Sequence, residues 1–234
     1  MARITIRVAA IDDDRMLLGG LRLWLGPTPD VDLVLTAASV AAYVESGCAA
    51  DVALLDLNLR DDSDPADNVR TLLATGARAL VVSTIPEPEA VLATVGAGAS
   101  GYVSKDQDLD VLLAAIREVA AGGFVISPEL AFVLSRDTRP GRSQLSPQER
   151  AVLTAYASGA TLAASARRAG VAYGTAKYYL ERVKRKYAEA GRPTYTSISP
   201  TGCGKTAGIS PRQREPRAAR RAPTAADPHH SPHR

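Results

Sequence analysis

The sequence has few of the features that mark secreted, membrane or fibrous proteins. It contains only two cysteines, Cys48 and Cys203, too few for a disulfide scaffold or a cysteine-rich zinc site. No apolar run approaches the roughly 18 residues that a membrane span needs, and no signal peptide is evident at the N-terminus. We therefore expect the chain to work in a reducing, cytoplasmic setting.

Charge is distributed unevenly along the 234 residues, although the formal net charge is only +3. Residues 1–144 hold 12 Lys/Arg against 20 Asp/Glu, which gives −8. Residues 145–195 hold 9 against 3, which gives +6, and residues 196–234 hold 7 against 2, which gives +5. An acidic part followed by a basic part indicates two modules with different partners, and the basic module is a candidate for binding nucleic acid.

The first half alternates short apolar runs with segments of helical periodicity. The expected strands cover residues 4–11, 31–35, 53–55, 80–82 and 101–104. The runs at 53–55 and 80–82 are continuously apolar, which is typical of strands buried on both faces. Five strands interleaved with helices predict an α/β fold with a doubly wound, five-stranded parallel sheet.

Polar side chains follow the ends of these expected strands. Asp12 and Asp13 follow the first strand, Asp56 the third, Ser83 the fourth and Lys105 the fifth. In a parallel sheet these ends share one edge, where ligands bind. Clustered carboxylates suit Mg²⁺, and a lysine opposite them suits an anion. The pattern therefore predicts a site for phosphoryl transfer onto an aspartate.

This half resembles the receiver domain of two-component response regulators, a flavodoxin-like fold. The motifs that carry the resemblance are Asp12-Asp13, Leu54-Leu-Asp56-Leu-Asn58, Val82-Ser83-Thr84 and Gly98-Ala-Ser-Gly-Tyr102-Val-Ser-Lys105. The resemblance implies that Asp56 accepts the phosphoryl group. It also implies that Mg²⁺ is held by Asp12, Asp13, Asp56 and the backbone carbonyl of Asn58, and that Ser83, Tyr102 and Lys105 bind the phosphate and switch. The loop after Asp56 lacks the Pro-Gly pair frequent in that family, so it departs from the family pattern there.

The second half carries the start signals of a small all-α domain. Ser146, Pro147 and Glu149 form a capping box at a helix start. A short helix is expected from Thr161 to about Gly170, and a longer one from about Tyr173 to Ala190. A short helix, a turn with glycine and a longer helix predict a helix-turn-helix. The basic surface of the last helix suits the DNA major groove.

Residues 145–195 resemble the LuxR-type DNA-binding domain. The motifs are Leu145-Ser-Pro-Gln-Glu149-Arg-Ala-Val-Leu153, Gly170-Val171 and Thr175-Ala-Lys177-Tyr-Tyr-Leu-Glu-Arg182-Val183. By this resemblance Lys177 and Tyr178 face bases, and Thr175, Arg182 and Lys184 lie nearer the DNA backbone. Gly174 and Glu181 depart from the family pattern, so the operator sequence is not transferable from relatives.

The expected organisation is a receiver domain (1–124), a linker (125–144), the helix-turn-helix (145–195) and a disordered, basic Pro/Arg-rich tail (196–234). The tail has no Leu, Val, Phe, Trp, Tyr or Met, so it cannot bury enough apolar surface to offset ordering. Its Gly202-Cys-Gly-Lys205 resembles a phosphate loop, but Ser199 stands where that motif needs glycine.

Together the two resemblances identify the chain as a member of the NarL/FixJ class of response regulators. This predicts a transcription regulator controlled by phosphorylation, with a sensor histidine kinase and double-stranded DNA as partners. We also expect a homodimer at least when active, no membrane partner, and no enzyme activity beyond slow loss of its own phosphate. The alternative is a receiver-based phosphate shuttle or protein-interaction switch with impaired DNA binding, which Glu181 and the lack of an expected fourth helix after the recognition helix motivate.

Overall fold

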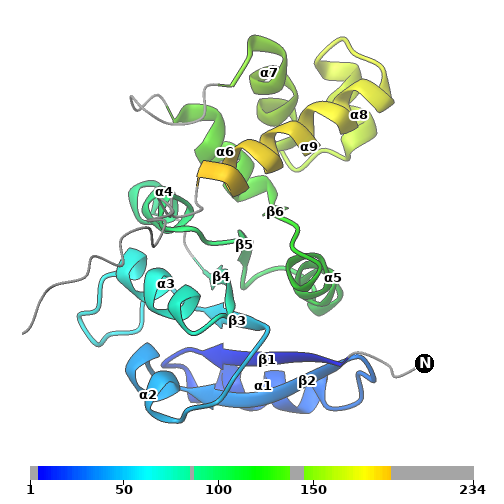
Figure 1. Ribbon diagram of the computed structural model, residues 1–234. Helices are drawn as coiled ribbons and strands as arrows, with labels where there is room; N and C mark the ends of the chain where they lie inside the picture. The colour runs from blue at the N-terminus through cyan, green and yellow to red at the C-terminus, as the bar shows by residue number, and fades with distance from the viewer. Residues whose placement is uncertain (1–4, 85–86, 138–144, 191–234) are drawn as a thin grey trace, which may run out of the picture. The chain divides into compact units, whose positions relative to one another are not determined.

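A computed structural model describes residues 5–84, 87–137 and 145–190 (Figure 1). Within these ranges the strands are β1 (Ile6–Ile11), β2 (Val31–Ala37), β3 (Val52–Leu55), β4 (Arg78–Ser83), β5 (Gly101–Ser104) and β6 (Val125–Ile126). The helices of the same part are α1 (Arg15–Leu25), α2 (Val40–Glu45), α3 (Pro65–Ala74), α4 (Pro88–Ala97), α5 (Leu109–Ala120) and α6 (Pro128–Arg136). The alternation of strand and helix confirms the predicted α/β class.

The sheet is parallel throughout, with the strand order β2-β1-β3-β4-β5-β6. The five expected strands are all present in the described residues. A sixth, β6, pairs with β5 and was expected to be linker. Gly101 permits this pairing, because an added Cβ there would lie 2.4 Å from the carbonyl oxygen of Val125. Its φ of +146° also favours glycine.

Helices cover the sheet on both faces, so the central strands are buried. All four residues of β3 and all four of β5 are buried. One face packs against α1 and α5, and the other against α2, α3 and α4. Figure 1 shows α5 on the opposite side of the sheet from α3 and α4. The carboxyl ends of the parallel strands therefore lie at one edge of the sheet, and both faces of the sheet are covered by helices.

The basic part folds into α7 (Pro147–Tyr156), α8 (Leu162–Arg168) and α9 (Tyr173–Ala190). The capping box at Ser146 and Glu149 is present, and Thr161 caps α8 as predicted. Val152, Ala166 and Ala176 form a small core among the three helices. This short-turn-long arrangement is the predicted helix-turn-helix.

The described residues belong to one compact unit. The domain limits that the sequence suggested remain predictions. The expected tail, residues 196–234, lies outside the described residues, and so does most of the stretch between α6 and α7. Among the described residues, no helix has both the length and the apolar character that crossing a membrane requires.

Candidate functional site

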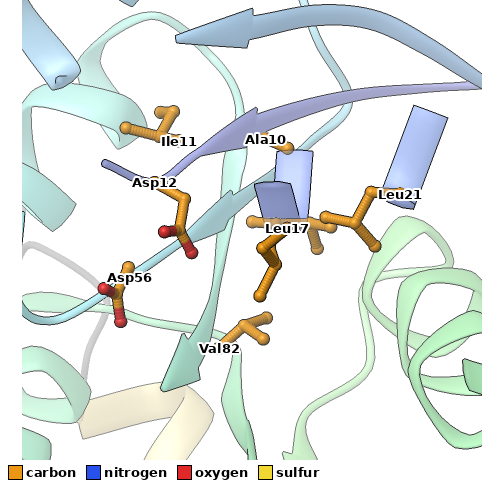
Figure 2. Close-up of a pocket in the computed structure, with 8 residues that line it drawn as sticks. Ala10, Ile11, Asp12, Leu17, Leu21, Asp56 and Val82 are labelled. Atoms are coloured by element: carbon orange, nitrogen blue, oxygen red, sulfur yellow. The ribbon is translucent and has the colours of Figure 1, made fainter. Parts of the chain in front are cut away.

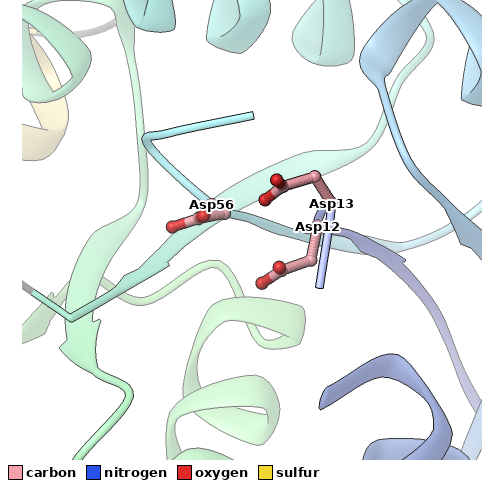
Figure 3. A group of neighbouring side chains, drawn as sticks. All are labelled: Asp12, Asp13 and Asp56. Atoms are coloured by element: carbon pink, nitrogen blue, oxygen red, sulfur yellow. The ribbon is translucent and has the colours of Figure 1, made fainter. Parts of the chain in front are cut away.

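Three carboxylates from two adjacent strands meet at the carboxyl edge of the sheet. Asp12 and Asp13 follow β1, and Asp56 follows β3, which pairs with β1. One carboxylate oxygen of each lies within 4.8 Å of the others, and Figure 3 shows the three side chains extending in the same direction. Asp12 and Asp56 are buried, with 4% and 6% of their surface exposed. We call Asp12, Asp13 and Asp56 the acidic triad.

Lys105, the residue after β5, neutralises part of this charge. Its Nζ lies 2.7 Å from Asp12 Oδ2 and 3.2 Å from Asp56 Oδ2. Its side chain is only 14% exposed, so water screens these two ion pairs weakly. The structure thus brings together the ammonium group that follows β5 and the carboxylates that follow β1 and β3. The order of polar residues after the expected strands predicted this meeting.

Burial and pairing act in opposite directions on these groups. Burial raises the pKa of the Asp12 carboxyl, even though Lys105 and the Asp14 backbone N–H, which donates over 2.9 Å, oppose the change. Burial would lower the pKa of Lys105, but the hydrogen bond to Asp12 and the two carboxylates raise it overall. Lys105 therefore stays charged in the pH range in which proteins work.

The other predicted phosphate-binding residues lie beside the triad. Ser83 ends β4 and is buried, and its carbonyl oxygen accepts bonds from the Lys105 backbone N–H and from the Tyr102 hydroxyl, both at 3.0 Å. Tyr102 is 0% exposed, and burial raises its pKa to about 12. Tyr102 therefore lies inside the protein in this conformation.

Apolar side chains close one side of the site. A small pocket adjoins Asp12 and Asp56, and Figure 2 shows Leu17 and Val82 beside it. Asn58, by contrast, is exposed in the loop after β3. Asp14 caps α1 by accepting bonds from two backbone N–H groups. Asp12 and Asp56 are therefore bounded on one side by apolar side chains of β1, α1, β3 and β4.

Sequence reasoning missed one residue of this site, Arg60. Its Nε lies 3.3 Å from Asp13 Oδ2. The residue stands in the loop that lacks the Pro-Gly pair, and its φ is +52°, a left-handed conformation that glycine normally takes. Nothing in the apolar periodicity indicates such a conformation, so only the coordinates reveal that this arginine turns toward the triad.

The second candidate site is the outer surface of α9. Lys177 and Tyr178 are exposed, Tyr178 at 56%, and Thr175 is half-buried. Arg182 stacks over Tyr178, with its Cζ 5.7 Å from the ring centroid. A cation and an aromatic ring on one exposed helix surface suit contact with nucleic acid.

Two predicted DNA-contacting cations of α9 are engaged in ion pairs in this conformation. Arg182 Nε lies 3.1 Å from the fully buried Glu149, so it also ties α9 to α7. Lys184 Nζ lies 2.6 Å from Glu118 on α5 and 3.3 Å from Glu181. Burial would lower the Lys184 pKa, but these carboxylates raise it. Lys184 is therefore charged but 17% exposed, and is not free to contact DNA here.

Comparison with known proteins places this geometry in context. No protein-family model matches the chain. The chain is 30% identical over 190 residues to the nitrate/nitrite response regulator protein NarL of Escherichia coli K12, covering 76% of this chain and 88% of that protein. It is 33% identical over 191 residues to the DNA-binding transcriptional activator DevR/DosR of Mycobacterium tuberculosis, covering 77% and 88%. The crystal structure of a LuxR-family two-component response regulator from an Aurantimonas species matches with a TM-score of 0.50 at 27% identity, covering 56% of this chain and 96% of that one.

Proposed function

Because the chain belongs to the NarL/FixJ class of response regulators, which are phosphorylation-controlled DNA-binding transcription regulators, we propose that Asp56 is its phosphoryl acceptor. The observation that carries this proposal is the convergence of the acidic triad and Lys105 at one sheet edge. Asp56 lies next to the other two carboxylates, which attract a cation, and next to the Lys105 ammonium, which attracts an anion. Phosphoryl transfer needs both kinds of group beside the acceptor.

The donor is a phosphohistidine of a sensor histidine kinase. An oxygen of Asp56 attacks phosphorus, the P–O bond forms as the P–N bond breaks, and the histidine nitrogen leaves with the bonding electrons. Lys105 then stands beside the oxygens of the transferred group and offsets their charge. Ser83, at the end of β4, offers a hydroxyl to the same oxygens. Water then attacks the phosphorus of the acyl phosphate slowly, the P–O bond to Asp56 breaks, and inorganic phosphate leaves while the free carboxylate is restored.

The donor set of the site fits Mg²⁺. Three carboxylates with oxygens within 4.8 Å of one another are hard ligands, and Asn58 is an exposed residue of the loop that follows Asp56. We propose that Asp13, Asp56 and the Asn58 carbonyl bind the ion directly and that Asp12 assists through water. When bound, Mg²⁺ supplies positive charge that stabilises the phosphoryl oxygens.

The test of this site is labelling by a small phosphodonor such as acetyl phosphate in the presence of Mg²⁺. We expect the wild-type chain and Asp67→Asn, which changes an exposed aspartate of α3, to be labelled equally. We expect no label on Asp56→Asn. A labelled Asp56→Asn chain, or an unlabelled wild type, refutes the assignment.

The output of the receiver is DNA binding through α9. Lys177 and Tyr178 present a cation and an aromatic ring for the major groove, with Thr175, Arg182 and Lys184 nearer the phosphates. A homodimer in the active state and a cytoplasmic location belong to the same proposal. Selection of promoter fragments from genomic DNA, with and without beryllium fluoride as a phosphate mimic, tests it. Recovery of no sequence-selective fragment in either state contradicts it.

Phosphorylation is proposed to act on α9 through the ion pair of Lys184 with Glu118. This pair joins the predicted DNA-contacting helix to α5, the helix that follows Lys105 in the chain. A conformation in which Lys184 is held by Glu118 and one in which it is free for phosphate contact are two states that phosphorylation biases.

A further inference from the structure

The loop after β3 holds a second cation at the acidic triad, and this cation differs in exposure from Lys105. Arg60 Nε lies 3.3 Å from Asp13 Oδ2, and its side chain is 79% exposed. Lys105 pairs with the other two members of the triad and is 14% exposed. Within the described residues, each carboxylate of the triad therefore has a cation beside it, one fixed in the interior and one at the solvent side.

The backbone of the loop directs Arg60 to this position. Arg60 and Asp62 are the two non-glycine residues with a positive φ in the described part of the chain, at +52° and +58°. The loop is held on both sides of Arg60, since Leu59 is buried and the Asn68 side chain donates to the Ser63 hydroxyl over 2.7 Å. The ion pair therefore belongs to a loop that contacts the rest of the domain on both sides of Arg60.

From this arrangement we propose that Arg60 is a built-in competitor of Mg²⁺, which lowers the affinity of the triad for the ion. The inference rests on the proposed function, in which Asp13 is a Mg²⁺ ligand. A guanidinium group 3.3 Å from Asp13 Oδ2 offsets the charge that attracts a dication, and it repels a dication placed on the same carboxylate. Because Arg60 is exposed, its head can turn into solvent when the ion binds, whereas Lys105 stays in place.

The size of the effect follows from the exposure of the pair. Exposed ion pairs are weak, so loss of the Arg60 charge should tighten Mg²⁺ binding about two- to five-fold at low ionic strength. Salt screens exposed charges, so the difference should shrink at about 0.5 M NaCl. Arg60 is a positioning residue in this proposal, because it acts on the metal through Asp13 and does not touch the phosphoryl group.

The experiment is calorimetric titration of the full-length chain with MgCl₂ alone, without any phosphodonor. Arg60→Gln removes the charge, Arg60→Lys keeps it, and Arg60→Gly removes it while accepting the left-handed backbone. The matched control is Arg70→Gln, which removes an exposed arginine paired with Asp67 on α3. We expect tighter binding for Arg60→Gln and Arg60→Gly, and wild-type affinity for Arg60→Lys and Arg70→Gln.

The outcomes separate this inference from the proposed function. If the wild type binds Mg²⁺, Asp13→Asn abolishes binding, and Arg60→Gln binds no tighter than wild type, the role of Arg60 is refuted while the metal site stands. If Arg60→Gln and Arg70→Gln tighten binding equally, net charge explains the effect and the proposal is again refuted. If the wild type shows no saturable Mg²⁺ binding, both the metal site and the role of Arg60 fail.

Discussion

The ammonium of Lys105 lies 3.2 Å from the carboxylate of Asp56, although the two residues follow different strands of the sheet. Their strands are separated by β4, so the contact spans the width of three strands at the carboxyl edge. Both side chains are mostly buried, and removing either one leaves the other charge in a poorly solvated place. The pair therefore links the stability of the receiver to the charge state of its site.

Replacement of Lys105 by glutamine should destabilise the protein in the absence of Mg²⁺. Two buried carboxylates would lose their cation, and we expect the free energy of unfolding to fall by about 1–3 kcal/mol. Mg²⁺ should restore part of this loss, because a dication offsets the same charges and binds the folded state. Urea unfolding with and without MgCl₂ measures both quantities. A loss of equal size under the two conditions would argue that Lys105 and the metal act at separate places.

Acid should weaken the helix-turn-helix through Glu149. Burial would raise the pKa of this carboxyl, but the Lys186 ammonium, the Ser146 backbone N–H and the Arg182 guanidinium lower it overall. A folded-state pKa below the ordinary value means that the charged form stabilises the fold above about pH 4.5. This stabilisation is lost as the pH falls through the lowered folded-state pKa.

The measurement for Glu149 is the pH dependence of unfolding in wild type and Glu149→Gln. We expect the variant to be less stable by about 1–3 kcal/mol at pH 7, and the two curves to converge only as the pH falls through the lowered folded-state pKa of Glu149. Glu189→Gln, an exposed change on α9, serves as the control and should follow the wild-type curve. A constant gap between wild type and Glu149→Gln across the whole pH range contradicts this reading of the ion pairs.

The sequence predicted those parts of the site that depend on strand order, and missed those that depend on loops and long-range contacts. The meeting of Asp13, Asp56 and Lys105 could be predicted from the sequence, because residues that follow parallel strands lie at the same edge of the sheet. Arg60 could not, because its left-handed backbone has no signature in apolar periodicity. The pairing of Lys184 with Glu118 joins residues from the two halves of the chain, and local patterns carry no information about such contacts.

The helix-turn-helix shows the same division within one small domain. The capping box at Ser146 and Glu149 was predicted, since both ends of that interaction lie within one helical turn. The ion pairs that Glu149 also makes with Arg182 and Lys186 were not, because they depend on how α9 packs against α7. Arg182, which the resemblance to the LuxR-type domain assigns to DNA, therefore has a structural role as well.

Because Arg182 has both roles, replacing it should affect DNA binding and stability, whereas replacing Lys177 should affect DNA binding alone. Lys177→Gln should weaken binding to a selected promoter fragment and reduce the preference for that fragment over unrelated DNA, with unfolding unchanged, because Lys177 is predicted to face bases. Arg182→Gln should weaken DNA binding and also lower the stability, because Glu149 would lose a cation. Fluorescence anisotropy with the promoter fragment and with unrelated DNA, together with thermal unfolding, measures the two effects. An unchanged preference for the promoter in Lys177→Gln would remove that residue from the base-contacting surface.

The ion pair of Lys184 with Glu118 predicts a variant that binds DNA without phosphorylation. Glu118→Gln removes the carboxylate but keeps Lys184, so the unphosphorylated chain should bind DNA about two- to five-fold more tightly than wild type. Asp30→Asn is the matched control, since it breaks the pair with Arg117 on the same helix without changing a partner of Lys184. After beryllium fluoride treatment the wild type and Glu118→Gln should bind equally, because the pair is then released in the wild type and is absent from the variant. Tighter binding by Asp30→Asn as well, or a gain in Glu118→Gln that persists after the treatment, would show that Glu118 acts through bulk charge rather than by holding Lys184.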